Sequence, residues 1–162
     1  MPVDIRPVSI RPVGIRGMAP LLQVFDMPTA VRFYRDVLGF ELVSTSQPGD
    51  DFGWCLLRSH GVELMLNTAY DEGQRPPVPD PARVAAHDDT CLYFGCEDLD
   101  STYRYLRSQG VSAREPKVAP YGMKQLYLKD PDGYGVCFQW PATQQSYDAW
   151  VAAYGLEPKT IA

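Results

Sequence analysis

The chain has 162 residues, of which 45% are hydrophobic and 12% aromatic, and its formal net charge is −5 at pH 7. This composition is typical of one globular domain with a single sizeable core and excludes a disordered chain. Because the charge is acidic and no basic run or face is present, we expect no nucleic-acid partner. No apolar run approaches the roughly 18 residues that span a bilayer, so we expect no membrane partner.

Residues 1–17 form an N-terminal extension with a near-repeat of five residues, IRPVS-IRPVG-IRGMA. Its prolines block a helix and disfavour a central strand, which leaves a loosely packed arm or an arm that clasps a partner chain. The extension lacks the apolar segment of a secretory signal. The four cysteines lack C-x-x-C spacing and lie in apolar strand patterns, which indicates reduced thiols in a cytoplasmic protein. They are Cys55, Cys91, Cys96 and Cys137.

A pattern of strand, helix and glycine stop occurs twice in the chain. Asp26 and Asp98 each follow an apolar strand at the position of a helix N-cap, where a carboxylate can accept from the free amides of the first turn. Gly39 and Gly110 each follow the last periodic residue of the helix, where a left-handed backbone favours glycine. Such a repeat predicts two similar modules that complete one structure. The two copies span 19–42 and 91–113.

Three further strands are expected after the first strand and helix of each copy, which gives two βαβββ modules and an α+β fold. In the strand GVELMLN, apolar Val62, Leu64 and Leu66 alternate with a mixed set that includes Glu63. The helix is therefore expected to cover one face of each sheet and to leave the other face free. The later strands are expected near 41–46, 52–58 and 61–67 in module one, and near 111–118, 124–129 and 135–140 in module two, after strand 91–96 and helix 98–109.

The domain is expected over 18–141, with module one at 18–67 and module two at 90–141. Residues 68–89 between them are rich in proline and charge, which is typical of a functional loop or a linker. In the C-terminal tail, 142–162, the spacing of aromatic residues predicts a short helix over 146–154 that packs on the domain or on a partner.

Four pieces of the sequence together resemble the vicinal-oxygen-chelate superfamily: VFDMPTAVRFYRDVLGFEL, GVELMLN, CEDLDSTYRYLRSQGV and LYLKDPDGYGVCFQW. That group includes glyoxalase I, extradiol dioxygenases, and fosfomycin and bleomycin resistance proteins. The resemblance covers about 18–141. It implies a cup-shaped mixed sheet with the helices on its outer face, and a homodimer. It does not by itself imply an activity, because the fold hosts unrelated functions.

The resemblance also implies where metal ligands would lie, on the first and last strand of each module. These positions fall on Ala19, Glu63, Cys91 and Cys137. Glu63 matches the family's usual ligands, Ala19 has no donor atom, and thiolates suit zinc better than the family's harder divalent metals. We therefore expect no metal cofactor. The alternative is a divalent metal at Glu63, Cys91 and Cys137, whose thiols otherwise serve as small buried apolar groups.

Strand parity places several polar and aromatic side chains on the free face, where they could orient a small-molecule ligand. Glu63 is either an ion-pair partner of Arg58 or Lys129, a general base, or an anchor for a cationic ligand. His60 and His87 fall in a turn and in the connector, where solvated histidines are common. The candidate ligand-binding residues are Gln23, Trp54, Glu63, Tyr93, Tyr121, Gln125, Tyr127 and Gln139, and Glu63 is also the catalytic candidate.

Two functions remain after this comparison of residues. The first is a metal-independent protein that sequesters a planar or cationic small molecule, as bleomycin resistance proteins do. The second is an enzyme of the glyoxalase or dioxygenase kind, a lyase, isomerase or dioxygenase in which a metal polarises vicinal oxygens. Glu63 favours the second function and Ala19 opposes it.

Overall fold

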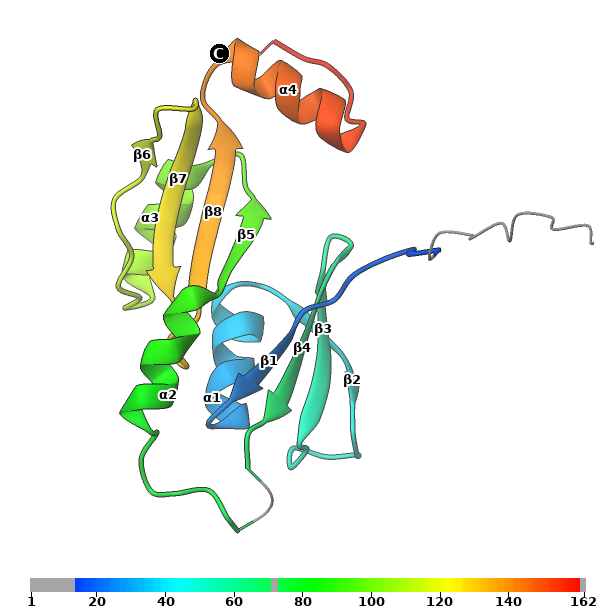
Figure 1. Ribbon diagram of the computed structural model, residues 1–162, viewed down its shortest axis with the longest axis vertical. Coiled ribbons are helices and arrows are strands. Elements are labelled where there is room, and N and C mark those ends of the chain that lie inside the picture. The colour runs from blue at the N-terminus through cyan, green and yellow to red at the C-terminus, as the bar shows by residue number, and fades with distance from the viewer. Residues whose placement is uncertain (1–13, 71–72, 161–162) are drawn as a thin grey trace, which may run out of the picture.

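The structure of the protein is a computed structural model that describes residues 14–70 and 73–160. Most of the expected N-terminal arm, residues 1–13, lies outside the described residues. The described chain forms two four-stranded sheets with strand orders β1-β4-β3-β2 and β5-β8-β7-β6 (Figure 1). The prediction of an α+β fold with two βαβββ modules is confirmed.

Module one begins with a parallel pair, β1 and β4, and continues with antiparallel β3 and β2. Its helix starts at Asp26, whose side chain accepts from the backbone N of Thr29 at 3.1 Å. Gly39 ends the helix with φ +80°, as the glycine stop predicted. The elements are β1 (Leu21–Val24), α1 (Met27–Val31), its π-helical continuation η1 (Arg32–Val37), β2 (Glu41–Thr45), β3 (Trp54–Ser59) and β4 (Val62–Thr68).

Module two repeats this arrangement, with β5 parallel to β8 and β7 antiparallel to β8. Asp98 caps its helix by accepting from Ser101 N at 3.0 Å, and Gly110 follows with φ +76°. The equivalent roles of Asp26 and Asp98 confirm that the sequence repeat is a structural repeat. The elements are β5 (Cys91–Gly95), α3 (Leu99–Ser108), β6 (Lys117–Val118), β7 (Met123–Lys129) and β8 (Gly135–Pro141).

The structure differs from the expected elements in three places. The connector contains a helix, α2 (Pro81–Ala86), followed by the 3-10 turn η2 (His87–Asp89); Asp80 caps α2 and proline occupies its first position. The strand expected at 111–118 is reduced to β6 and one bridge at Ala113, because Pro116 cannot donate to a ladder. The tail helix α4 (Gln144–Tyr154) starts earlier than expected, at a capping box formed by Thr143 and Ser146.

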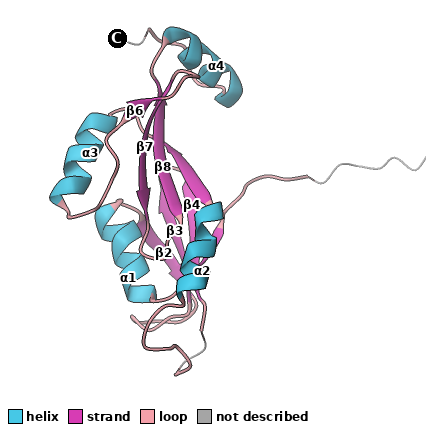
Figure 2. Ribbon diagram, turned by 60° about the vertical axis from the view of Figure 1, so that its left-hand side comes forward, coloured by secondary structure: helices cyan, strands magenta, loops and turns pink. Residues whose placement is uncertain are grey.

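Helices α1 and α3 lie on the same side of the strands, which leaves the opposite face of both sheets free of them (Figure 2). Buried apolar side chains such as Val24, Leu66 and Val136 fill the helix side. One core runs through both modules, since the rings of Phe40 and Phe94 meet edge to face with centroids 5.9 Å apart. No helix within the described ranges is both long and apolar enough to cross a bilayer.

A turn of module two also joins the modules. The β7–β8 turn, Asp130-Pro131-Asp132-Gly133-Tyr134, reaches module one, where Tyr34 donates to Asp130 Oδ2 at 2.8 Å. Asp132 Oδ1 accepts from Phe25 N at 2.6 Å, and the Tyr134 hydroxyl donates to Gln23 O at 3.2 Å. The two carboxylates are 95% buried, so their hydrogen bonds are made in a water-poor junction. Burial raises the pKa of Asp130 to about 6 and raises the pKa of Asp132.

Candidate functional site

Three tyrosines and two glutamines form a hydrogen-bonded network on the free face of the second sheet. Tyr93 and Tyr127 share a hydrogen bond of 3.1 Å between their hydroxyls, and Tyr127 donates to Gln125 Oε1 at 3.1 Å. Tyr121 donates to the same oxygen at 2.9 Å, and Gln125 Nε2 donates to Gln139 Oε1 at 3.1 Å. We call this set the tyrosine–glutamine network. All five members were candidate ligand-binding residues, and the structure brings them together.

Strand pairing explains why these residues meet. Tyr93 on β5 and Tyr127 on β7 both lie opposite Cys137 on the central strand β8. Their rings stand edge to face with centroids 6.2 Å apart, and Cys137 is fully buried. The hydrogen bond shared with Tyr93 and the loss of hydration raise the pKa of Tyr127 well above its usual value, so its hydroxyl stays protonated at neutral pH.

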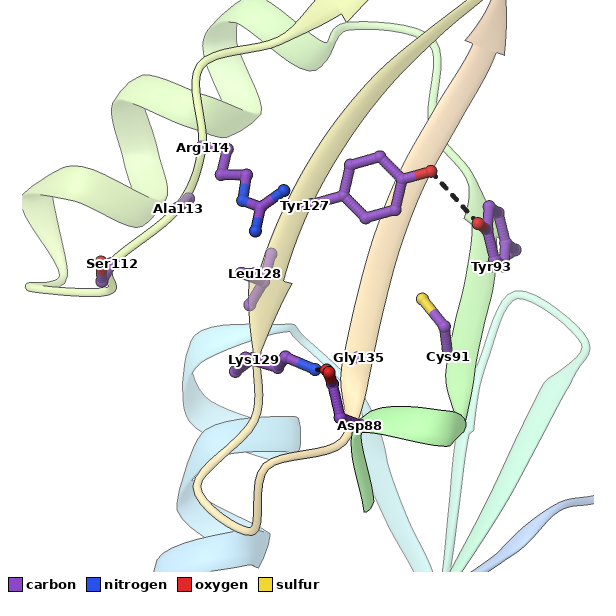
Figure 3. A pocket seen from close by; sticks show the side chains of 10 residues that line it. All are labelled: Asp88, Cys91, Tyr93, Ser112, Ala113, Arg114, Tyr127, Leu128, Lys129 and Gly135. Atoms are coloured by element: carbon purple, nitrogen blue, oxygen red, sulfur yellow. Dashed lines mark hydrogen bonds and ion pairs between the residues drawn. The ribbon is translucent and has the colours of Figure 1, made fainter. Parts of the chain in front are cut away.

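A cavity of about 530 Å³ adjoins the network, and we call it the module-two cavity (Figure 3). Figure 3 shows the tyrosine pair at one side of it, Cys91 pointing inward, and the cations Arg114 and Lys129 at the other side. Lys129 forms an ion pair with Asp88 from η2. The lining residues are Asp88, Cys91, Tyr93, Ser112, Ala113, Arg114, Tyr127, Leu128, Lys129 and Gly135.

The sequence patterns missed the charged part of this lining. Arg114 follows the strand bridge at Ala113, in a segment whose irregular backbone hides its facing from an alternation argument. Lys129 was considered as a partner of Glu63, but it pairs with Asp88 instead. The only sequence signal for Arg114 and Asp88 is their nearness to the predicted strands of module two.

The remaining candidates lie apart from the network. Glu63 is paired with Arg58 on the adjacent strand, Nη2 to Oε1 at 2.6 Å, which matches one of the three roles considered for it. Gln23 accepts from Asn67 Nδ2 at 3.1 Å on the first sheet, beside the buried β7–β8 turn. Trp54 is half-buried on β3, opposite Asn67.

A second cavity of about 550 Å³ lies between the modules and brings some of these candidates near each other. It is lined by Glu63 from β4, by Cys91 and Tyr93 from β5, and by Gln139 from β8, with Trp150 and Tyr154 of α4 at one end. The free edge of β5 thus separates two cavities, and Cys91 and Tyr93 line both.

The residues that would hold the family's metal do not fit one. Within the described part of the chain, no three His, Cys, Asp or Glu side chains are placed to hold one ion. The Glu63 carboxylate accepts from the Arg58 guanidinium, and the Cys137 thiol is buried beneath the tyrosine pair. Burial raises the pKa of Cys137 to about 11 and also raises the pKa of Cys91, so both are thiols at neutral pH.

The two histidines make local contacts. The ring of His87 stacks on Tyr134 at 4.0 Å between centroids, and its Nδ1 lies 2.7 Å from the backbone O of Asp132. His60 occupies the exposed β3–β4 turn with φ +46°. All four cysteines are free, in agreement with the expectation of reduced thiols.

Comparisons with known proteins identify the same fold. TnmS3, an antibiotic binding protein from Streptomyces sp. CB03234, is 25% identical, with a TM-score of 0.58 over 79% of this chain and 98% of that protein. A bleomycin resistance determinant encoded on the transposon Tn5 is 22% identical, with a TM-score of 0.58 over 80% of this chain and 100% of its own. A bleomycin-binding protein solved with bleomycin is 22% identical, with a TM-score of 0.56 over 77% and 98% of the two chains.

No curated protein sequence matches the chain significantly. The family described as the glyoxalase/bleomycin resistance protein/dioxygenase superfamily matches residues 17–138, which covers both modules. The chain therefore belongs to the glyoxalase/bleomycin resistance protein/dioxygenase superfamily.

Proposed function

We propose that this chain is a small-molecule-binding protein that acts without a metal ion and holds a planar organic ligand on the free face of module two. One observation carries the proposal: five polar and aromatic side chains, four from three strands and one from the turn before β7, form a hydrogen-bonded network beside a cavity of about 530 Å³. Cavities of this size, with an aromatic wall and a few convergent polar groups, are typical of small-ligand sites.

One comparison supports small-molecule binding, and one feature of this chain favours binding without a metal. The fold is shared with TnmS3, an antibiotic binding protein, at 25% identity. The donor set that would make a metal site includes one residue without a donor, Ala19, and one carboxylate already engaged by a guanidinium, Glu63. A metal-dependent lyase, isomerase or dioxygenase remains the competing function.

The proposal includes a homodimer, because apolar side chains near the free strand edges are exposed to solvent. Met18, Leu21, Val62 and Tyr93 are each 43% exposed or more, and they lie on β1, β4 and β5 or just before β1. A twofold pair is the commonest arrangement that covers such surfaces. Light scattering at high micromolar concentration should report twice the mass of the chain, and a monomer there would contradict the pairing. The free thiols support a cytoplasmic location, which we include in the proposal.

Metal analysis combined with calorimetry tests the function. Protein purified without a chelator should bind naphthalene or anthracene ligands with the same affinity before and after EDTA treatment. The function would be wrong if the protein carried about one equivalent of zinc that Cys91→Ser or Cys137→Ser removed, because the enzyme alternative would then explain the site.

A further inference from the structure

The charged side chains of the module-two cavity are mainly positive, whereas the whole chain is negatively charged. The chain carries −5, but this cavity contains two cations, Arg114 and Lys129, against one carboxylate, Asp88. Asp88 is already paired with Lys129. The lining therefore carries one more cation than carboxylates, although Arg114 also interacts electrostatically with Asp88.

Arg114 is placed to use this charge on a ligand. Within the described residues its guanidinium makes no hydrogen bond or ion pair, while its backbone N is fixed by a 2.8 Å hydrogen bond to Tyr127 O. Figure 3 shows the guanidinium pointing into the cavity next to the Tyr127 ring. Its planar fork matches a carboxylate bidentately, whereas a lysine would act only as a point charge.

The other polar groups of the cavity are neutral. The hydroxyls of Tyr93 and Tyr127 and the thiol of Cys91 carry no negative charge, and the two hydroxyl protons are already used within the network. Glu63, the carboxylate that could attract a cation, lines the other cavity and is paired with Arg58. An anionic ligand therefore meets a guanidinium that makes no hydrogen bond within the described residues, whereas a cationic ligand meets no free carboxylate.

We infer that the ligand of the module-two cavity is a planar aromatic acid, whose anionic oxygens bind the Arg114 guanidinium and whose ring packs against the Tyr93–Tyr127 pair. This inference rests on the proposed function and specifies the chemical class of its ligand. Arg114 is its specificity-determining residue. The aromatic acid takes the place of the cationic ligand that the sequence analysis considered.

Matched pairs of ligands separate the charge from the ring. Calorimetry on the full chain compares naphthalene-2-carboxylate with naphthalene-2-carboxamide, and anthracene-2-carboxylate with its carboxamide. The carboxylate should bind about tenfold more tightly than the amide, as a charge-assisted hydrogen bond to a guanidinium predicts. The preference should shrink as ionic strength rises, because the site is open to solvent.

The variant Arg114→Gln should abolish the preference for the carboxylate while the amides bind as before. Arg107→Gln, which removes another exposed arginine in the last turn of α3 that does not line the cavity, is the matched control and should keep the preference. Because both side chains are exposed, both variants should fold, and the melting temperature verifies this.

The outcomes distinguish the two proposals. Three results would overturn the anionic class and leave the proposed function standing. The unaltered protein could bind acid and amide equally, the preference could survive in Arg114→Gln, or that variant could lose both ligands in parallel. Failure of all four compounds to bind would overturn both.

Discussion

The third and fourth strands of each module are joined by a tight turn, and the two turns lie in opposite surroundings. In module one, Ser59-His60-Gly61 is exposed and contacts little beyond itself. In module two, the turn from Asp130 to Tyr134 is buried against module one and makes hydrogen bonds to Tyr34 and to the backbone of β1 and the residue after it. One of the two corresponding turns thus connects the modules, and the other is a surface loop.

The free faces differ in a similar way. On the two central strands of module one, Arg58 lies opposite Glu63, and on those of module two, Tyr127 lies opposite Cys137. The first is a surface ion pair with both partners more than one-third exposed, while the second belongs to the tyrosine–glutamine network. The central strands therefore carry a solvated charge pair in one module and part of the candidate site in the other. The predictions below test this contrast.

Removing the Asp130 carboxylate should have the largest effect on stability. Asp130→Ala leaves three buried donors without an acceptor, the Tyr34 hydroxyl and the amides of Asp132 and Tyr134. We expect a loss of about 4 kcal/mol in the free energy of unfolding. Ser59→Ala in the equivalent turn should change it by less than about 0.5 kcal/mol. Denaturant unfolding measures both, and similar losses would refute the division of roles between the turns.

The glycines of the two turns provide a second test of the difference between the buried and the exposed turn. Gly133 and Gly61 both have positive φ, but a Cβ at Gly133 would lie 2.8 Å from Val84 O and 2.9 Å from Val84 Cγ1, whereas Gly61 faces open space. Gly133→Ala should therefore cost about 3 kcal/mol, from backbone strain and displacement of α2, and Gly61→Ala about 1 kcal/mol from strain alone. Thermal unfolding of both variants checks the difference of roughly 2 kcal/mol.

The buried turn should also make stability depend on pH. Because burial raises the pKa of Asp130 to about 6, above its unfolded value near 3.8, the folded state binds the extra proton between these pH values. Its contribution is most favourable below pH 4 and is lost as the pH rises through 6, by about 3 kcal/mol. Asp130→Asn cannot titrate, so the stability of the native protein relative to this variant should fall between pH 4 and pH 7. A constant difference would contradict the burial argument.

Loss of a single hydroxyl from the network should affect binding more than stability. Tyr127→Phe removes the donor to Gln125 and the hydrogen bond to Tyr93. The affinity for naphthalene-2-carboxylate should fall about fivefold, equivalent to about 1 kcal/mol. Tyr105→Phe removes a hydroxyl that bonds to Val37 O outside the network and should leave the affinity unchanged. Equal effects of the two variants in calorimetry would remove the network from the site.

The smallest effect is expected at Glu63. Glu63→Gln breaks an exposed ion pair with Arg58, which should change the free energy of unfolding by less than about 0.5 kcal/mol. Binding of naphthalene-2-carboxylate should stay within about twofold, because Glu63 does not line the module-two cavity. A large loss of affinity in this variant would return Glu63 to a functional role.

Much of the fold could be predicted because it depends on local patterns. Alternation assigned Leu22 and Val24 to the helix side and Gln23 to the free side, and the two aspartate caps revealed the repeat. Alternation failed where proline and irregular backbone interrupt it, so α2 in the connector was missed and a strand was expected where only β6 forms.

The candidate site was predictable to the extent that it lies on regular strands. Parity placed Tyr93, Tyr127, Gln125 and Gln139 on one face, since side chains two residues apart point the same way. It could not predict Arg114, which enters the cavity from a segment outside a regular strand, or the pairing of Lys129 with Asp88, which comes from η2. These contacts join residues that are far apart in sequence, and no local periodicity encodes them.

The amino-acid sequence by itself determined the two modules, the faces of their strands and the family to which they belong, because caps, glycine stops and alternation act over a few residues. Only the tertiary structure decided that the second turn is buried while the first is exposed, and that Glu63 meets Arg58 rather than a ligand. The reason is physical. The polar groups of an exposed turn can hydrogen-bond to water, whereas those of a turn covered by another module must find partners within the protein.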